Sequence, residues 1–168
     1  MIKILYDLNF VCFNIKNYVG NRFLIPSGPL RENLNSIKKY DAVFLNGNGE
    51  NIANIKNEIK LIKSDIKIFE AAYSPTNLDK LDKKLNYLVF SGIGNPDSFK
   101  KTLVDNNFII SEFLVFPDHY NYKDSDIKKI KFNAEKFNAK ILTTEKDYMR
   151  INKTELSNIN HLKVELKI

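Results

Sequence analysis

The chain has 168 residues, of which 43% are hydrophobic and 27% charged, and its formal net charge is +6. These values are ordinary for one compact domain with a short extra arm. No apolar run approaches the roughly 18 residues that span a membrane. The single cysteine, Cys12, excludes an internal disulfide, and with His119 and His161 it is too small a set for a Cys/His zinc site.

The positive charge has two explanations. It suits a polyanionic partner such as nucleic acid, but lysine is abundant along the whole sequence and acids stand between the lysines. Because no arginine and aromatic pattern accompanies the charge, we expect no nucleic-acid partner. The segment 1–8 alternates apolar residues and carries Asp7, so we expect neither a signal peptide nor a membrane anchor.

The first forty residues predict a strand-rich arm, because their strand-like segments have no crossover helices between them. These segments are residues 2–6, 10–15 and 23–25. Cys12 lies in an apolar run, which favours a small buried hydrophobe over a reactive thiol. The turn Pro26–Pro29 is expected to lead into a helix that begins at Arg31 and Glu32. Arg31 offers a planar fork for a phosphate, or makes a surface ion pair.

From residue 41 onward, short apolar strands alternate with amphipathic helices. The expected strands are residues 42–45, 66–69, 87–90, 108–115, 140–143 and 164–168. The expected helices are residues 52–62, one that begins at Pro96 and buries Phe99, Leu103 and Val104, one at about 125–137, and a short one after Thr144. This alternation predicts βαβ units and an α/β fold, with a three-layer α/β/α domain around a mainly parallel sheet.

The segment from Ser91 to Pro96 leaves a strand and enters a helix. Asn95 suits the N-cap of that helix, and Pro96 suits its first position. The free N–H groups of such a turn fit an anion or a sugar, but a tight strand-to-helix turn explains the same residues. The segment lacks the third glycine of the dinucleotide fingerprint, so it predicts no nucleotide site.

His119 follows a strand within Phe116-Pro117-Asp118-His119 and precedes a helix. We therefore expect it at the carboxyl edge of the sheet, where open α/β folds bind ligands. A histidine in a polar loop can act as a general base near neutral pH. It can equally cap the next helix or bind a carbonyl, and the residues themselves leave both roles open.

A third strand-to-helix junction contains Thr144-Glu145-Lys146-Asp147-Tyr148-Met149-Arg150. Thr144 and Asp147 approximate a capping box. Lys146 has the length to reach a phosphate, but helix capping accounts for most of this segment.

Taken together and in this order, four segments resemble the family of tetraacyldisaccharide 4'-kinases, also called lipid A 4'-kinases. They are Gly20-Asn21 with Pro26–Glu32, Ser91–Pro96, Phe116-Pro117-Asp118-His119-x-x-Tyr122 and Thr144–Asp147 with Tyr148-x-Arg150. The resemblance implies transfer of the ATP γ-phosphoryl group, with Mg²⁺, to the 4'-hydroxyl of an acylated glucosamine disaccharide lipid. It implies that this occurs at the inner face of the cytoplasmic membrane.

The resemblance also assigns residues. His119 would pair with an aspartate to deprotonate the sugar hydroxyl, and the substrate-binding residues would be Arg31, Glu32, Asn95 and Asp118. No G-x-x-x-x-G-K-[ST] loop occurs in the sequence. The ATP-binding and Mg²⁺-binding segments and the partner aspartate are therefore expected to precede residue 1.

This resemblance suggests a domain organisation. Residues 1–36 are interpreted as a strand-rich arm and linker, the remnant of a P-loop kinase domain, and residues 37–168 as a C-terminal α/β/α domain. Family members join their two domains by a strand linker, which would match residues 22–25 and 162–168. Two positions depart from the family pattern: Arg22 stands where glycine is usual, and Asn33 where proline is usual.

Three functions follow from the sequence. The first is a lipid A 4'-kinase fragment, inactive alone because it lacks the P-loop, whose partner would be a chain carrying the P-loop half. The second is a non-catalytic α/β binding module for the lipid-sugar or for a partner chain. The third, nucleic-acid binding, has only the net charge in its favour.

Overall fold

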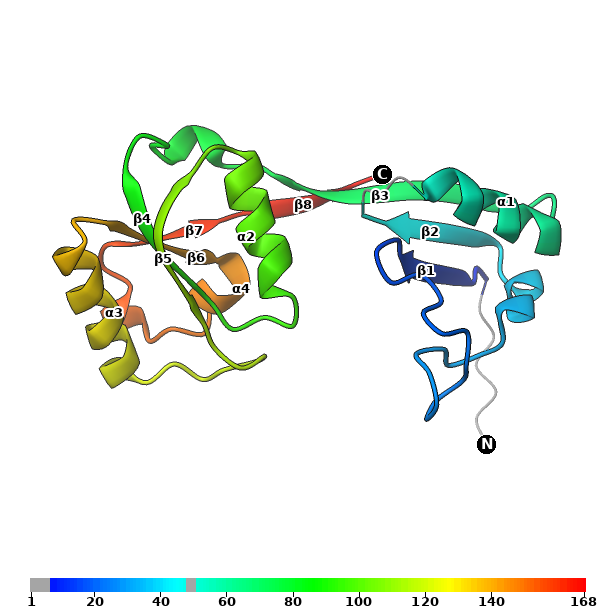
Figure 1. Cartoon of the computed structure of the whole chain (residues 1–168), viewed down its shortest axis with the longest axis horizontal. Helices are drawn as coiled ribbons and strands as arrows, with labels where there is room; N and C mark the ends of the chain where they lie inside the picture. The colour runs from blue at the N-terminus through cyan, green and yellow to red at the C-terminus, as the bar shows by residue number, and fades with distance from the viewer. Residues whose placement is uncertain (1–6, 48–50) are drawn as a thin grey trace. The chain divides into compact units, whose positions relative to one another are not determined.

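The structure is a computed structural model that describes residues 7–47 and 51–168 (Figure 1). The chain divides into two units, Met1–Ser74 with Leu166–Ile168 (unit 1) and Pro75–Glu165 (unit 2). This boundary lies later than the expected one after residue 36. The physical reason is strand pairing, because the strands within residues 42–75 join the sheet of the arm rather than the sheet of unit 2.

Unit 1 contains a sheet with the strand order β1-β2-β3-β8, in which β1, β2 and β3 are parallel. The elements of this sheet and its helices are β1 (Phe10–Asn14), the 3-10 helix η1 (Leu34–Lys39), β2 (Ala42–Asn46), α1 (Ile52–Ile62), β3 (Lys67–Pro75) and β8 (Val164–Lys167). The unit boundary falls within β8 and at the last residue of β3. Apolar residues at spacings of three and four place Ile55 and Ile59 of α1 on the sheet. They pack with Val43 and Leu45, which confirms the predicted β2 and α1.

Cys12 is exposed, so the prediction that it is buried was wrong. Side chains of a strand alternate between the two faces of its sheet. Val11 and Phe13 therefore contact the core of unit 1, whereas Phe10 and Cys12 point to the opposite face. An apolar run at a sheet edge does not by itself bury every one of its residues.

Three further predictions for the arm need correction. Residues 23–25 form no strand and make only the isolated bridge between Leu24 and Leu30. The helix begins after the cap Asn33, whose side chain accepts from the N–H of Asn35 at 2.9 Å, and not at Arg31 and Glu32. The strand beside β8 is β3, not residues 22–25. The expected strand at 2–6 lies outside the described residues.

Arg22 and Asn33, the two positions expected to depart from the family pattern, have backbone conformations that glycine and proline also adopt. Arg22 has φ +68°, a left-handed conformation that glycine adopts without strain. Asn33 has φ −61° and ψ 144°, which proline also adopts. The two residues thus occupy backbone conformations that explain why glycine and proline suit these places.

Unit 2 is built on a second parallel sheet, with strand order β5-β4-β6-β7. Its elements are the 3-10 helix η2 (Leu78–Lys80), β4 (Asn86–Ser91), α2 (Pro96–Asp105), β5 (Ile109–Val115), α3 (Asp124–Lys136), β6 (Lys140–Thr144), α4 (Glu145–Tyr148), the 3-10 helix η3 (Lys153–Glu155) and β7 (Ile159–Leu162). The sequence did not predict β7, because its four residues include the polar Asn160 and His161 and form no apolar run.

The helices of unit 2 cover both faces of its sheet. On one face, Ile127 and Ile130 of α3 pack with Leu88 and Phe90 of β4. On the other face, residues of α2 pack with the alternate residues of β4; they are Phe99 and Leu103 against Tyr87 and Val89. This is the predicted α/β/α arrangement with a mainly parallel sheet. Val104 is 54% exposed, so its predicted burial was wrong; it lies off the face of α2 that packs on the sheet.

In the part of the chain that the structure describes, we find no helix with both the length and the apolar character required of a membrane span.

Candidate functional site

Two loops and the N-terminus of α4 meet beyond the carboxyl ends of β4, β5 and β6. They follow Ser91, Val115 and Thr144, the last residues of these parallel strands. The backbone O of Gly92 accepts from the N–H of His119 at 3.1 Å, and the N–H of Gly92 donates to Asp147 Oδ2 at 3.1 Å. The predicted position of the histidine loop at this edge is confirmed, and ligands of open α/β sheets bind there.

His119 has a left-handed backbone, with φ +59°. This conformation is uncommon for residues other than glycine and costs roughly 1 kcal/mol. Two hydrogen bonds hold it, because the N–H of His119 donates to Gly92 O and to Asp118 Oδ1, the latter at 2.9 Å. The imidazole itself remains 80% exposed. The backbone is thus fixed while the ring is open to a ligand.

Asp147 is a buried acid, with a side chain 0% exposed, at the start of α4. Its Oδ2 accepts from Thr144 Oγ1 at 2.7 Å and from the N–H of Gly92, and its Oδ1 lies 3.3 Å from Arg150 Nη1. A buried carboxylate is tolerated when it is paired and hydrogen-bonded in this way. Thr144 also caps α4, since its side chain accepts from the N–H of Asp147, as predicted.

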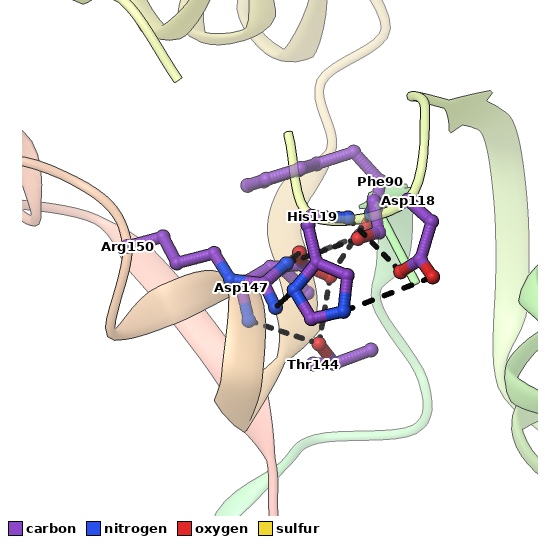
Figure 2. A network of polar contacts seen from close by, with 8 residues as sticks. Phe90, Asp118, His119, Thr144, Asp147 and Arg150 are labelled. Atoms are coloured by element: carbon purple, nitrogen blue, oxygen red, sulfur yellow. Dashed lines mark hydrogen bonds and ion pairs between the residues drawn. The ribbon is translucent and has the colours of Figure 1, made fainter. Parts of the chain in front are cut away.

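Arg150 connects this buried acid to the exposed histidine (Figure 2). Its Nη1 donates to Gly92 O at 3.0 Å, and its Nη2 lies 3.0 Å from His119 Nδ1. The sequence had suggested helix capping for the segment that contains Asp147 and Arg150, and neither residue was chosen as a site residue. The sequence did contain a sign of this contact, because Asp147 and Arg150 are oppositely charged and three residues apart, a spacing at which side chains meet across one helical turn.

Aromatic side chains pack beneath the His119 loop, on the side of the hydrophobic core. Tyr122 is buried, and its ring packs edge-on against Phe90 and Phe116 at centroid distances of 5.3 and 5.2 Å. Burial, followed by the negative charge of Asp147, raises the pKa of Tyr122, so this phenol stays protonated at physiological pH. A Cβ atom added to Gly92 would lie 2.9 Å from the Tyr122 hydroxyl. The backbone of Gly92 therefore approaches its neighbours as closely as only glycine allows.

The remaining predicted site residues divide between the units. Asp118 lies beside His119, with its Oδ2 3.9 Å from His119 Nε2. Asn95 is the N-cap of α2, where its side chain accepts from the N–H of Ser98 at 3.2 Å, and Pro96 begins the helix, as predicted. Arg31 and Glu32 are exposed residues of unit 1. Their assignment to substrate binding stays a prediction.

Two observations concern the ATP and Mg²⁺ that the family resemblance implies. No P-loop sequence occurs in the 168 residues. Within residues 7–47 and 51–168, no cluster of three or more His, Cys, Asp or Glu side chains is placed to hold a metal ion. At the carboxyl edge of the sheet of unit 2, the imidazole of His119 instead lies in contact with the guanidinium group of Arg150.

Comparison with known proteins identifies relatives that are about twice as long as this chain. The sequence profile of the family described as tetraacyldisaccharide-1-P 4'-kinase matches residues 2–168. Tetraacyldisaccharide 4'-kinase of Pelagibacter ubique is 50% identical over 97% of this chain and 52% of its own length. The enzyme of that name from Rickettsia akari is 37% identical over 96% of this chain and 48% of its own. The chain spans about half the length of these curated relatives.

A solved structure also matches. It is described as the "apo" form of LpxK from Aquifex aeolicus in complex with ATP, is 26% identical, and aligns with a TM-score of 0.60 over 96% of this chain and 48% of that one. The parallel sheet of unit 2, with a histidine loop at its carboxyl edge, places the chain among α/β proteins that bind ligands at such an edge. More narrowly, the chain belongs to the tetraacyldisaccharide-1-P 4'-kinase family of lipid A biosynthesis.

Proposed function

We propose that this chain is the sugar-activating half of a lipid A 4'-kinase. In this proposal, His119 takes the proton from the 4'-hydroxyl of an acylated glucosamine disaccharide, and the freed oxygen attacks the γ-phosphorus of ATP. The observation that carries the proposal is the His119 loop, whose backbone is fixed by two hydrogen bonds while 80% of the ring side chain is exposed. A general base must present its nitrogen to a hydroxyl within hydrogen-bond reach.

In this proposal, ATP and Mg²⁺ bind to the other half of the kinase, not to this chain. Phosphoryl transfer depends mainly on positioning and on stabilisation of charge by a phosphate loop and a metal ion. The 168 residues contain no such loop, so they are expected to be inactive as a kinase by themselves. Asp118, at the same edge as His119, is the acid best placed to bind a sugar hydroxyl. Asn95 is already occupied as a helix cap.

The test mixes this chain with the N-terminal half of the Pelagibacter ubique relative, supplied as a second polypeptide. Transfer of labelled phosphoryl from ATP to the acylated disaccharide 1-phosphate is measured for each chain alone and for the mixture. We expect transfer only in the mixture, and at least a 100-fold loss with His119→Asn. Asparagine also adopts the left-handed conformation, so the loop keeps its backbone. His161→Asn is the matched control and should retain transfer.

Transfer by this chain alone, or full activity of His119→Asn in the mixture, would contradict the proposal. The absent phosphate loop also favours a second function, a non-catalytic module that binds the lipid-sugar. That function predicts ATP-independent binding of the acylated disaccharide by this chain, with no transfer after the P-loop half is added.

A further inference from the structure

The Arg150 side chain is anchored on one of its two terminal nitrogens. Nη1 donates to Gly92 O at 3.0 Å and lies 3.3 Å from Asp147 Oδ1, and the carboxylate of Asp147 is itself held by Thr144. The Arg150 side chain is only 23% exposed, against 80% for His119. Arg150 is therefore the fixed member of the pair, and the imidazole rests against it.

The direction of the contact between Arg150 and His119 follows from their chemistry. A guanidinium group carries only donors and keeps its charge in proteins. At 3.0 Å from Nη2, His119 Nδ1 must therefore be the acceptor. A neutral imidazole with an acceptor at Nδ1 carries its proton on Nε2. The nearest described acid at Nε2 is Asp118, and its Oδ2 at 3.9 Å lies beyond hydrogen-bond distance.

The backbone of His119 argues against an incidental surface contact. An exposed histidine ordinarily samples several rotamers and both neutral tautomers. Here the residue is held at φ +59° by Gly92 O, the same carbonyl that anchors Arg150 Nη1. One backbone atom thus positions both partners. Strained conformations that persist because their neighbours determine them are concentrated at functional sites.

We propose that Arg150 is a positioning residue that selects the protonation site of His119. Its hydrogen bond holds the ring as the Nε2–H tautomer and leaves Nδ1 as the nitrogen able to take a proton. The substrate hydroxyl reaches Nδ1 by replacing Nη2 as the hydrogen-bond donor. The proton then moves from the hydroxyl oxygen to Nδ1, and Nε2–H remains free to donate to a carboxylate. This inference rests on the proposed role of His119, but the tautomer is measured without catalysis.

The test uses the ¹⁵N-labelled full chain and long-range ¹H–¹⁵N spectra of the imidazole rings, recorded where the histidines are neutral. His119→Asn assigns the signals, and His161 is the internal reference. We expect one tautomer at His119, with Nε2 protonated and Nδ1 an acceptor. A mixture of tautomers or a protonated Nδ1 in the unmodified chain would overturn the inference, whatever any variant does.

Two variants extend the test. Arg150→Met removes the donors and keeps the length, so the His119 signals should move to the averaged values of an exposed histidine. Arg150→Lys keeps the positive charge and one donor nitrogen, so it should retain part of the single-tautomer signal that Arg150→Met loses. Amide spectra of α2 and α3 show whether unit 2 remains folded. An unchanged single tautomer in a folded Arg150→Met chain would contradict the inference. Retained transfer by His119→Asn would instead contradict the proposed function and the proton transfer to Nδ1, but not the selection of the tautomer by Arg150.

Discussion

The sheets of the two units differ in how their faces are covered. In unit 2, α2 and α3 pack on opposite faces, and residues 87–90 of the central strand β4 are at most 2% exposed. In unit 1, the core formed with α1 and η1 takes side chains from one face. The other face carries Phe10, Phe44 and Phe69. The ring of Phe10 meets that of Phe44 edge-on at a centroid distance of 5.5 Å, and Phe44 stacks on Phe69 at 5.1 Å.

This difference shows which unit covers both faces of its sheet with its own helices. Unit 2 closes its hydrophobic core with its own helices and then presents the His119 loop from a rigid edge. In unit 1, Phe10 is 50% exposed and Phe69 is 38% exposed. An exposed aromatic row of this kind adds little to the stability of the chain that bears it, since the apolar area is not removed from water.

The largest expected effect comes from comparing one Phe→Ala substitution in each sheet. Phe90 is 0% exposed and contacts Phe116 and Tyr122, so Phe90→Ala should cost roughly 3–5 kcal/mol of unit 2 stability. Phe10→Ala removes a half-exposed ring and should cost about 1 kcal/mol or less. Hydrogen exchange, read separately over the peptides of each unit, measures both. Equal losses would show that the aromatic face of unit 1 is covered.

The sequence predicted most elements of both units but not their grouping. The apolar runs at β2, β3, β4 and β6 are local signals, and so are the helix periods of α1 and α3. Which strands pair is decided by contacts far apart in the chain. The sequence therefore could not show that residues 42–75 join the sheet of Phe10–Asn14. The same limit explains Cys12, since burial on one face of a strand depends on what covers that face.

At the candidate site, the sequence predicted the position of the His119 loop but not the contact that Arg150 makes with it. A histidine in a polar loop after a strand is visible in the sequence, and so is the cap Thr144. The network of Asp147, Arg150 and Gly92 joins residues 55 and 58 positions apart. Helix capping already explained the segment that holds Asp147 and Arg150, so the local sequence offered no reason to expect that these residues also contact Gly92 and His119. Only the meeting of the strand ends reveals these contacts.

The next test uses pH, because both histidines of the sequence lie in unit 2. Burial lowers the pKa of His161, whose ring centroid lies 4.2 Å from that of Tyr148; Lys163 also lowers it, and Glu145 opposes. Between the lowered folded value and the ordinary unfolded one, the unfolded chain binds more protons. The neutral His161 side chain should therefore make its full contribution to the unfolding free energy of unit 2 above the pKa of an unfolded histidine. This contribution should decrease as the pH falls from that pKa through the lower pKa of folded His161.

His161→Phe keeps a ring against Tyr148 and removes this titration. Urea unfolding of unit 2, compared between about pH 7.5 and about pH 5.5 in a His119→Asn background, should show a smaller acid loss for His161→Phe than for His161. Unit 1, which has no histidine, should lose less than unit 2 over the same interval. An identical acid loss with and without His161 would exclude this residue as the source.

The smallest effect is expected at Arg22 in unit 1, where two terms oppose one another. The left-handed backbone at φ +68° costs about 1 kcal/mol for any residue with a Cβ atom. The ion pair from Arg22 Nη1 to Glu58 Oε1, at 2.7 Å on a side chain 66% exposed, returns about 0–1 kcal/mol. Arg22→Gly should therefore leave stability nearly unchanged.

Arg22→Ala is the matched control, because it also loses the ion pair but keeps the Cβ atom. The glycine variant should be more stable than the alanine variant by less than about 1 kcal/mol, because the greater freedom of unfolded glycine takes back part of the gain from the relieved backbone. Urea unfolding of both variants measures this difference. An alanine variant as stable as the glycine variant would contradict the left-handed backbone at this turn. The expected sign would instead support the left-handed backbone of Arg22 in unit 1.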